Sequence, residues 1–209
     1  MPELHDFFDE IDLARTRRVK ELSEIKRTYS QSSFGDVYGI ASKSVVILTY
    51  ANWEGFYNEC VRAYLRFLSE KGGKVRDTDW PLLVGAFHSD FESMRGRNHS
   101  FESRQNFVER LKSKMDCSFD AVDTTVVEAR SNLNFSRLSQ NYELLSFDVS
   151  AMQSVRIRLD KELVGWRHAV AHGDSPDLNS MDVEDHIDFA SLLMTMVADN
   201  FQYAMLDRV

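Results

Sequence analysis

The chain has few of the residues that interrupt helices or cross-link small folds. Its composition includes Cys 2, Pro 3 and Gly 9 among 209 residues. The isolated Cys60 and Cys117 exclude a disulfide framework and a cysteine-rich zinc site, and they indicate reduced thiols in an intracellular protein. Scarce proline and glycine, together with few strand-like alternations of Val, Ile and Thr, favour helix along most of the chain.

A long hydrophobic run is also missing. The longest, around Val45 to Leu48, is far shorter than a membrane span requires. The stretch from Met1 to Asp6 lacks the basic and then apolar pattern of a signal peptide. These absences predict a soluble, cytoplasmic protein with no membrane partner.

Net positive charge is absent as well, since the formal net charge is −8. Phosphate binding is driven by Lys and Arg that displace counterions, so this balance argues against a protein that coats nucleic acid non-specifically. A local basic cleft is still compatible with it.

The residues that are present suit one globular domain, 1–209, because 43% hydrophobic and 28% charged residues are enough for a sizeable core in a soluble chain. Helical periodicity predicts an all-α helical bundle with a long N-terminal helix. The expected segments are an N-terminal helix at 1–30, a core helix at 38–71, a variable helical insert at 72–150, and a motif helix with a closing helix at 151–206.

The N-terminal helix is predicted from an apolar seam that begins at Leu4 and ends at Ile25. A basic cluster interrupts this seam. Its interpretation stays open between contact with phosphates and a solvated helix face, the usual role of such a run. The seam consists of Leu4, Phe8, Ile11, Leu22 and Ile25, and the cluster of Arg15, Arg17, Arg18 and Lys20.

The core helix carries two further features. Gly55 lies among large rings, in Trp53 to Phe56, which suits the close approach of a neighbouring backbone. Arg62 and Arg66 are four residues apart and share a helix face. They are candidate RNA-binding residues in a basic wall, and surface charge is the alternative that the sequence leaves open.

The insert contains weaker signals. Asp79 is the expected cap of a single helix from Trp80 to Met94, and Ser100 that of the helix that follows. The β-prone run Val122–Val127 predicts a short extended piece. The other expected helices are Phe101–Asp116 and Leu133–Leu145.

The stretch Trp166–Asp174 is the most informative part of the chain. On a helix, His168 and His172 project from one face, and the long side chain of Arg167 reaches the same region. Histidine exchanges a proton near neutral pH, and the guanidinium binds phosphate oxygens bidentately. The set therefore suits phosphodiester cleavage without a metal, with the 2′-hydroxyl of RNA as nucleophile. The alternative is a helix end whose cations satisfy its last carbonyls.

A metal site formed by His168, His172 and Asp174 is a further alternative, although the chain lacks the Glu of a zinc-protease helix. His88, Asp90 and His99 would add ligands only if the fold brought them close. His5 and His186 are expected to be surface or helix-packing residues.

The run Leu163–Gly173 resembles the signature of the HEPN superfamily, the higher eukaryote and prokaryote nucleotide-binding domains. That signature is an Arg, a polar residue, and a His after four to six intervening residues near a helix end. Arg167 matches the Arg, His168 the polar position that is often Asn, and His172 the His. Asn52–Phe56 and the closing helix also resemble the bacterial branch of defence and toxin modules.

The resemblance implies a HEPN-type bundle that forms a homodimer, so that Arg167 and His172 of both copies face one cleft. Arg167 would neutralise the scissile phosphate, His172 would handle the proton or position the ribose, and His168 would give polar support. The implied reaction needs no cofactor or metal and leaves a 2′,3′-cyclic phosphate. Some members carry a tyrosine, modified by a partner enzyme, where this chain has Asp174, so that form of control is not expected.

These features predict a metal-independent endoribonuclease of a prokaryotic toxin or anti-phage defence system. Its expected partners are RNA, a second copy of the chain, and an antitoxin or other defence protein. The alternative is a non-catalytic HEPN-like module for dimerisation or partner binding, because the acidic balance gives RNA little general attraction.

Overall fold

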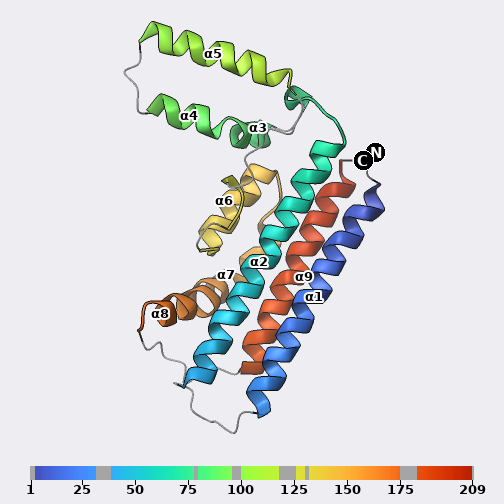
Figure 1. The fold of residues 1–209 in the computed structure, drawn as a ribbon, viewed down its shortest axis with the longest axis vertical. Coiled ribbons are helices and arrows are strands. Elements are labelled where there is room, and N and C mark those ends of the chain that lie inside the picture. The colour runs from blue at the N-terminus through green and yellow to red at the C-terminus, as the bar shows by residue number, and fades with distance from the viewer. Residues whose placement is uncertain are drawn as a thin grey trace.

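The computed structural model describes residues 3–31, 39–77, 80–95, 100–117, 126–129, 132–174 and 183–208. Helices dominate these residues, and no strand occurs among them (Figure 1). The predicted all-α class is confirmed. No helix in the described ranges combines the length and apolarity that crossing a bilayer requires.

Three long helices lie side by side and form the body of the molecule (Figure 1). They are α1 (Leu4–Gln31), α2 (Ile40–Glu70) and α9 (Val183–Leu206). Helix α1 runs opposite to α2 and α9, so both chain ends lie at the same end of the bundle. The predicted N-terminal, core and closing helices are therefore present, with ends close to those expected.

The core is built on α2, whose buried side chains face both other long helices. Its Tyr64 ring meets the edges of Phe147 and Phe201, whose own ring centroids are 4.8 Å apart. Edge-to-face pairs of this kind add to the free energy of burying aromatic area. From α1, the predicted seam supplies the buried Ile11 and Leu22. Ile40, the first residue of α2, is 86% exposed.

A second layer covers α2 on the side that carries the motif. Asn134 is the N-cap of helix α6 (Phe135–Leu145), and its side-chain oxygen accepts a hydrogen bond from the Arg137 backbone N–H at 2.8 Å. Four helical pieces then follow one another and end beside the first half of α2. They are a 3₁₀ turn (Ser150–Val155), α7 (Arg156–Arg158), a π-helical segment (Leu159–Trp166) and α8 (Arg167–Ala171).

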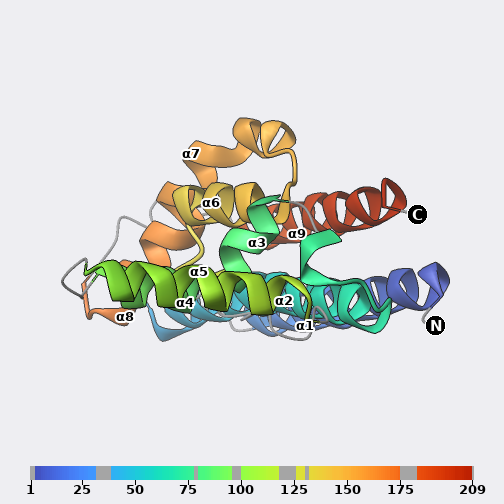
Figure 2. The same ribbon diagram turned by 90° about the horizontal axis from the view of Figure 1, so that it is seen from above.

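The remaining helices form an outer arm that leans away from the long helices (Figures 1 and 2). It consists of α3 (Trp80–Ala86), which packs on α6, and of α4 (His88–Arg95) and α5 (Phe101–Met115). The prediction of one helix over Trp80–Met94 is wrong. The helix is interrupted at Phe87. The side chain of Phe87 is 3% exposed and packs with Val75. The prediction that Ser100 caps the next helix is confirmed, since its hydroxyl accepts from the Ser103 N–H at 3.2 Å.

Two other local predictions need correction. Gly55 does meet a close neighbour, but it is a side chain and not a backbone: a Cβ at Gly55 would lie 2.7 Å from Nη2 of Arg18. Residues 122–125 of the predicted extended piece lie outside the described residues, and so does the predicted cap Asp79. Val126 and Val127 are buried in a turn, where the Val127 carbonyl accepts hydrogen bonds from the Tyr57 hydroxyl and the Asn141 amide.

Candidate active site

The motif is presented by a helix whose winding changes just before it. Leu159, Leu163 and Val164 of the π-helical segment are buried in the core. The Asp160 carboxylate accepts a hydrogen bond from the Phe135 N–H at 2.6 Å, which ties this segment to the start of α6. Wide π turns inside α-helices occur frequently at functional sites. The sequence predicted one regular helix here and did not indicate this change.

The motif helix ends in a turn that depends on Gly173. The Gly173 N–H bonds to the Val170 carbonyl at 3.2 Å, and the Asp174 N–H bonds to the Ala169 carbonyl at 2.9 Å. Gly173 has φ +80°, the left-handed conformation that glycine adopts most easily. Together these are the Schellman end of a helix. The turn fixes His172 as the last residue before the chain changes direction.

His168 and His172 lie together at this helix end, as their four-residue spacing predicts. Their ring centroids are 4.3 Å apart and the planes are tilted by 51°. Both side chains are exposed. Two imidazoles therefore stand next to each other in solvent, where a bound substrate or a second protein could reach them.

Arg167 points in a different direction, toward α2. Its side chain is half-buried, and the guanidinium carbon lies 4.5 Å from the centre of the Tyr50 ring, within the range of a cation–π contact. Five residues of α-helix correspond to a rotation of about 140°, so Arg167 and His172 leave α8 on different sides. Only the flexibility of the arginine would bring both to one ligand within a single copy.

Tyr50 was not identified from the sequence as part of the site. It is 2% exposed. Its hydroxyl donates to the Glu54 carboxylate at 2.7 Å and accepts from the Leu133 N–H at 2.8 Å. Burial raises the pKa of the phenol well above its ordinary value. The only local signal was the four-residue spacing of Tyr50 and Glu54, which allows the two side chains to meet on a helix.

On the other side of the motif, Trp166 packs against His186 of α9, with ring centroids 5.4 Å apart and planes tilted by 30°. His186 is 1% exposed, and neither ring nitrogen has a hydrogen-bond partner among the described residues. Burial, with a contribution from the Arg158 cation, lowers its pKa from 6.5 to about 4, although Asp185 acts in the opposite direction. The expectation that His186 is a packing residue is met, and His5 lies exposed beside Asp9 at 3.2 Å.

Arg62 and Arg66 are not brought next to Arg167. Because a helix rises about 1.5 Å per residue, they lie roughly 18 and 24 Å further along α2 than Tyr50. The Arg62 Nε donates to Glu128 at 2.9 Å, and Arg66 pairs with Glu10. Both arginines thus contact carboxylates on the surface.

Carboxylates also surround the basic cluster of α1. Arg15 pairs with Asp12 at 3.1 Å, while Arg17 and Arg18 both pair with Glu59. These contacts favour the interpretation of the cluster as a charge-compensated helix surface.

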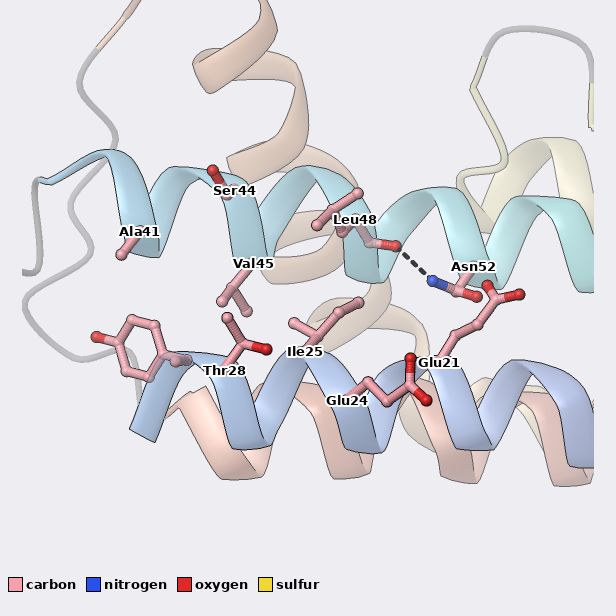
Figure 3. A pocket seen from close by; sticks show the side chains of 10 residues that line it. Glu21, Glu24, Ile25, Thr28, Ala41, Ser44, Val45, Leu48 and Asn52 are labelled. Carbon is pink, nitrogen blue, oxygen red and sulfur yellow. Dashed lines mark hydrogen bonds between the residues drawn. The ribbon is translucent and has the colours of Figure 1, made fainter. Parts of the chain in front are cut away.

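A groove of about 510 Å³ lies between α1 and α2 (Figure 3). Glu21 and Glu24 stand on its α1 side, and Leu48 and Asn52 on its α2 side. Tyr50 is two residues from each of the latter, so it faces roughly the opposite side of α2. The groove is therefore separate from the motif, and its acidic rim disfavours RNA phosphates.

The metal alternative finds no support in the described part of the chain, where no three His, Cys, Asp or Glu side chains are grouped so as to hold an ion. This covers the set His168, His172 and Asp174. Of the other ligands considered, Asp90 pairs with Lys114 at 2.5 Å, while His99 and the His88 side chain lie outside the described residues.

The model of the family described as RiboL-PSP-HEPN matches residues 14–202. No curated protein and no solved structure matches. The matched range covers α2, the motif and most of α1 and α9, and it includes the segment expected to be a variable insert. The resemblance to the HEPN superfamily is thereby confirmed, and this all-α chain belongs to the RiboL-PSP-HEPN family.

Proposed function

We propose that the protein is a metal-independent endoribonuclease whose cleavage site is shared by two copies, acting in a prokaryotic toxin or anti-phage defence system. The observation that carries the proposal is the arrangement around α8. Arg167 rests on the ring of Tyr50, and the neighbouring helix end presents His168 and His172 to solvent. Membership of a HEPN-type family adds support for ribonuclease-type chemistry.

In the proposed reaction, the Arg167 guanidinium binds two oxygens of the scissile phosphate and compensates the charge that grows on them. His172 accepts the proton of the 2′-hydroxyl, whose oxygen then attacks phosphorus. The bond to the 5′-oxygen breaks, and that oxygen takes a proton. The products are a 2′,3′-cyclic phosphate and a 5′-hydroxyl end. His168, packed against the ring of His172, limits its motion.

The directions of the side chains support a site shared by two copies. Within one copy, Arg167 faces α2 while His172 faces solvent at a helix end. A second copy that brings its own helix end to this position would surround one phosphate with two arginines and two histidines. One histidine could then accept the 2′ proton while the other protonates the leaving oxygen.

The proposal is tested by incubating the purified protein with RNA in EDTA, beside Arg167→Ala and His172→Ala. We expect cleavage by the wild type and a loss of about a hundredfold or more in each variant. His5→Ala, which changes an exposed histidine on α1, is the control and should cleave normally. Absence of cleavage by the wild type, or undiminished cleavage by both variants, would overturn the proposal. Cleavage only with added divalent metal would favour the metal alternative.

We further propose that Arg62 and Arg66 bind backbone phosphates of the RNA away from the point of cleavage. Their position on α2 suits an extended strand, and phosphates would have to replace Glu128 and Glu10 as their partners. Weaker RNA binding by the Arg62→Ala/Arg66→Ala variant, with an unchanged rate at saturating RNA, is the result this role requires.

The non-catalytic module is the second candidate, and the net charge of −8 favours it. Expression toxicity separates the two. Expression of a toxin should inhibit growth, and His172→Ala should relieve this inhibition. Cells that express a dimerisation or partner-binding module should grow equally well with the wild type and with His172→Ala.

A further inference from the structure

We infer that Tyr50 is a positioning residue: its ring is the platform that holds the Arg167 guanidinium in place to bind a phosphate. What Arg167 does there rests on the proposed function. The contact between the Tyr50 ring and the Arg167 guanidinium does not depend on that function, and NMR can detect it without any cleavage activity.

The first support is the contact between the two groups. The guanidinium carbon lies 4.5 Å from the ring centre, and the ring is 2% exposed. A cation over the face of an aromatic ring is attracted by the ring quadrupole, and more strongly where water is excluded. Arg167 is the first residue of α8, directly after the π-helical segment. A platform on the long, well-packed α2 would therefore fix an arginine that an irregular helix presents.

The second support is that the ring itself is held at its far end. The Tyr50 hydroxyl donates to Glu54, one turn further along α2, and accepts from the Leu133 N–H, which belongs to the segment leading into α6. Two hydrogen bonds to different elements hold the hydroxyl in place and so restrain the long axis of the ring. A phenylalanine would offer the same face to Arg167 without this restraint.

The third support is that stacking and phosphate binding use different parts of arginine. An aromatic ring stacked on arginine contacts the flat face of the guanidinium, whereas bidentate hydrogen bonds to phosphate are made by N–H groups in its plane. One guanidinium can make both contacts. Because burial raises the pKa of the Tyr50 phenol, the residue stays protonated at neutral pH and contributes its ring and not a proton transfer.

The alternative is that Tyr50 only fills the core, and α2 offers a matched control for that role. Tyr57 lies on the same helix, is 0% exposed, and donates its hydroxyl to the Val127 carbonyl at 3.0 Å. Its ring meets Phe201 edge-on, with ring centroids 6.3 Å apart. Substitutions of Tyr57 therefore report what losing a buried tyrosine on α2 costs without a change under Arg167.

The primary test is NMR of the arginine side chains, with the Arg167 signals assigned by their loss in Arg167→Lys. We expect its δ protons to be shifted upfield by the Tyr50 ring current and to show NOEs to the ring protons in the wild type. The shift should persist in Tyr50→Phe and Tyr57→Phe and disappear in Tyr50→Leu. Absence of the NOEs in the wild type would overturn the inference even if Tyr50→Leu failed to fold. So would an upfield shift that survives in a folded Tyr50→Leu.

The second test uses RNA cleavage. Loss of a cation–π contact should lower kcat/KM of Tyr50→Leu by roughly tenfold. Tyr50→Phe and Tyr50→Trp, which keep a ring, should retain most of the activity, and Tyr57→Leu should retain activity in proportion to its folded fraction. Loss that follows thermal stability in all variants, and not the presence of a ring at position 50, would contradict a positioning role. If the wild type does not cleave RNA, the proposed function fails while the NMR result still decides whether the platform exists.

Discussion

His186 shows at the scale of one residue how burial sets chemistry beside the candidate site. Its ring packs on Trp166, directly before Arg167, and is 1% exposed without a hydrogen-bond partner among the described residues. A protonated imidazole would need water or a hydrogen-bond acceptor there, so the folded state holds His186 neutral. Protonation of this residue would therefore disturb the packing that supports the motif helix.

This burial predicts a loss of stability in mild acid. The pKa of His186 is lowered from 6.5 to about 4 in the folded state. Above pH 6.5 both states are neutral and the residue adds no pH dependence. As the pH falls, the unfolded state takes up the proton first, so the free energy of unfolding should drop by about 1.4 kcal/mol per pH unit. The free energy of unfolding in urea should fall between pH 7 and pH 5 by about 2 kcal/mol more for the wild type than for His186→Phe.

His5→Gln is the control for His186, because it removes an exposed histidine whose ring lies beside Asp9. It should unfold with the pH dependence of the wild type. An identical loss of stability in acid for the wild type and His186→Phe would show that His186 is not held neutral in the fold.

At the scale of one element, the segment Ser150–Ala171 changes its winding three times and then ends abruptly at a Schellman turn. The π-helical part is anchored on its apolar side by the core and at Asp160 by the start of α6. The last turn is anchored by Gly173. The positions of Arg167 and His172 are thus set by different supports, one on α2 and one in the terminal turn.

Comparing alanine substitutions at Gly173 and Gly72 separates the cost of backbone strain from an effect on RNA cleavage. Gly173 and Gly72 have φ of +80° and +78°, and a Cβ at either position would have nothing within 4 Å. The strain of an L side chain in this conformation should therefore cost Gly173→Ala and Gly72→Ala a similar amount, about 1–2 kcal/mol in the free energy of unfolding. Only Gly173→Ala should also lower RNA cleavage, because His172 precedes it. Equal effects of the two variants on cleavage, measured under conditions where both are folded, would contradict this prediction.

At the scale of the whole molecule, the distribution of charge would restrict how the protein binds RNA in the proposed function. The net charge is −8, and carboxylates lie beside Arg15, Arg17 and Arg18 of α1 and beside Arg62 and Arg66 of α2. General attraction for RNA is therefore weak, and specificity has to come from a small site. Assembly of two copies around one phosphate would concentrate Arg167 and His172 at a single point without making the whole surface basic.

A shared cleft predicts complementation between inactive subunits. Arg167→Ala and His172→Ala chains with different tags are co-expressed, and the mixed dimer is purified through both tags. Its cleft would still contain one Arg167 and one His172, contributed by different copies, so we expect cleavage above that of either parental dimer. A mixed dimer as inactive as its parents would contradict a site in which the arginine of one copy works with the histidine of the other. If no dimer is recovered, even from two differently tagged wild-type chains, the proposed homodimer does not form.

The sequence by itself determined the helical class, the three long helices and the position of the motif. These depend on apolar periodicity and on spacing within a few turns, which are properties of neighbouring residues. The adjacency of His168 and His172 is local in the same sense, and the two rings lie together as their spacing predicts.

Only the tertiary structure decided what surrounds that motif. Periodicity does not say which helix faces which, so the sequence did not indicate the partners in three contacts: Tyr50 under Arg167, His186 against Trp166, and Arg18 against Gly55. Each of these contacts joins residues far apart in the chain. The role of each arginine likewise depends on its neighbours in the fold. Arg62 pairs with Glu128, while Arg167 lies on an aromatic ring near two exposed histidines. The motif was local information, and its direction, support and exposure came from the packing of distant helices.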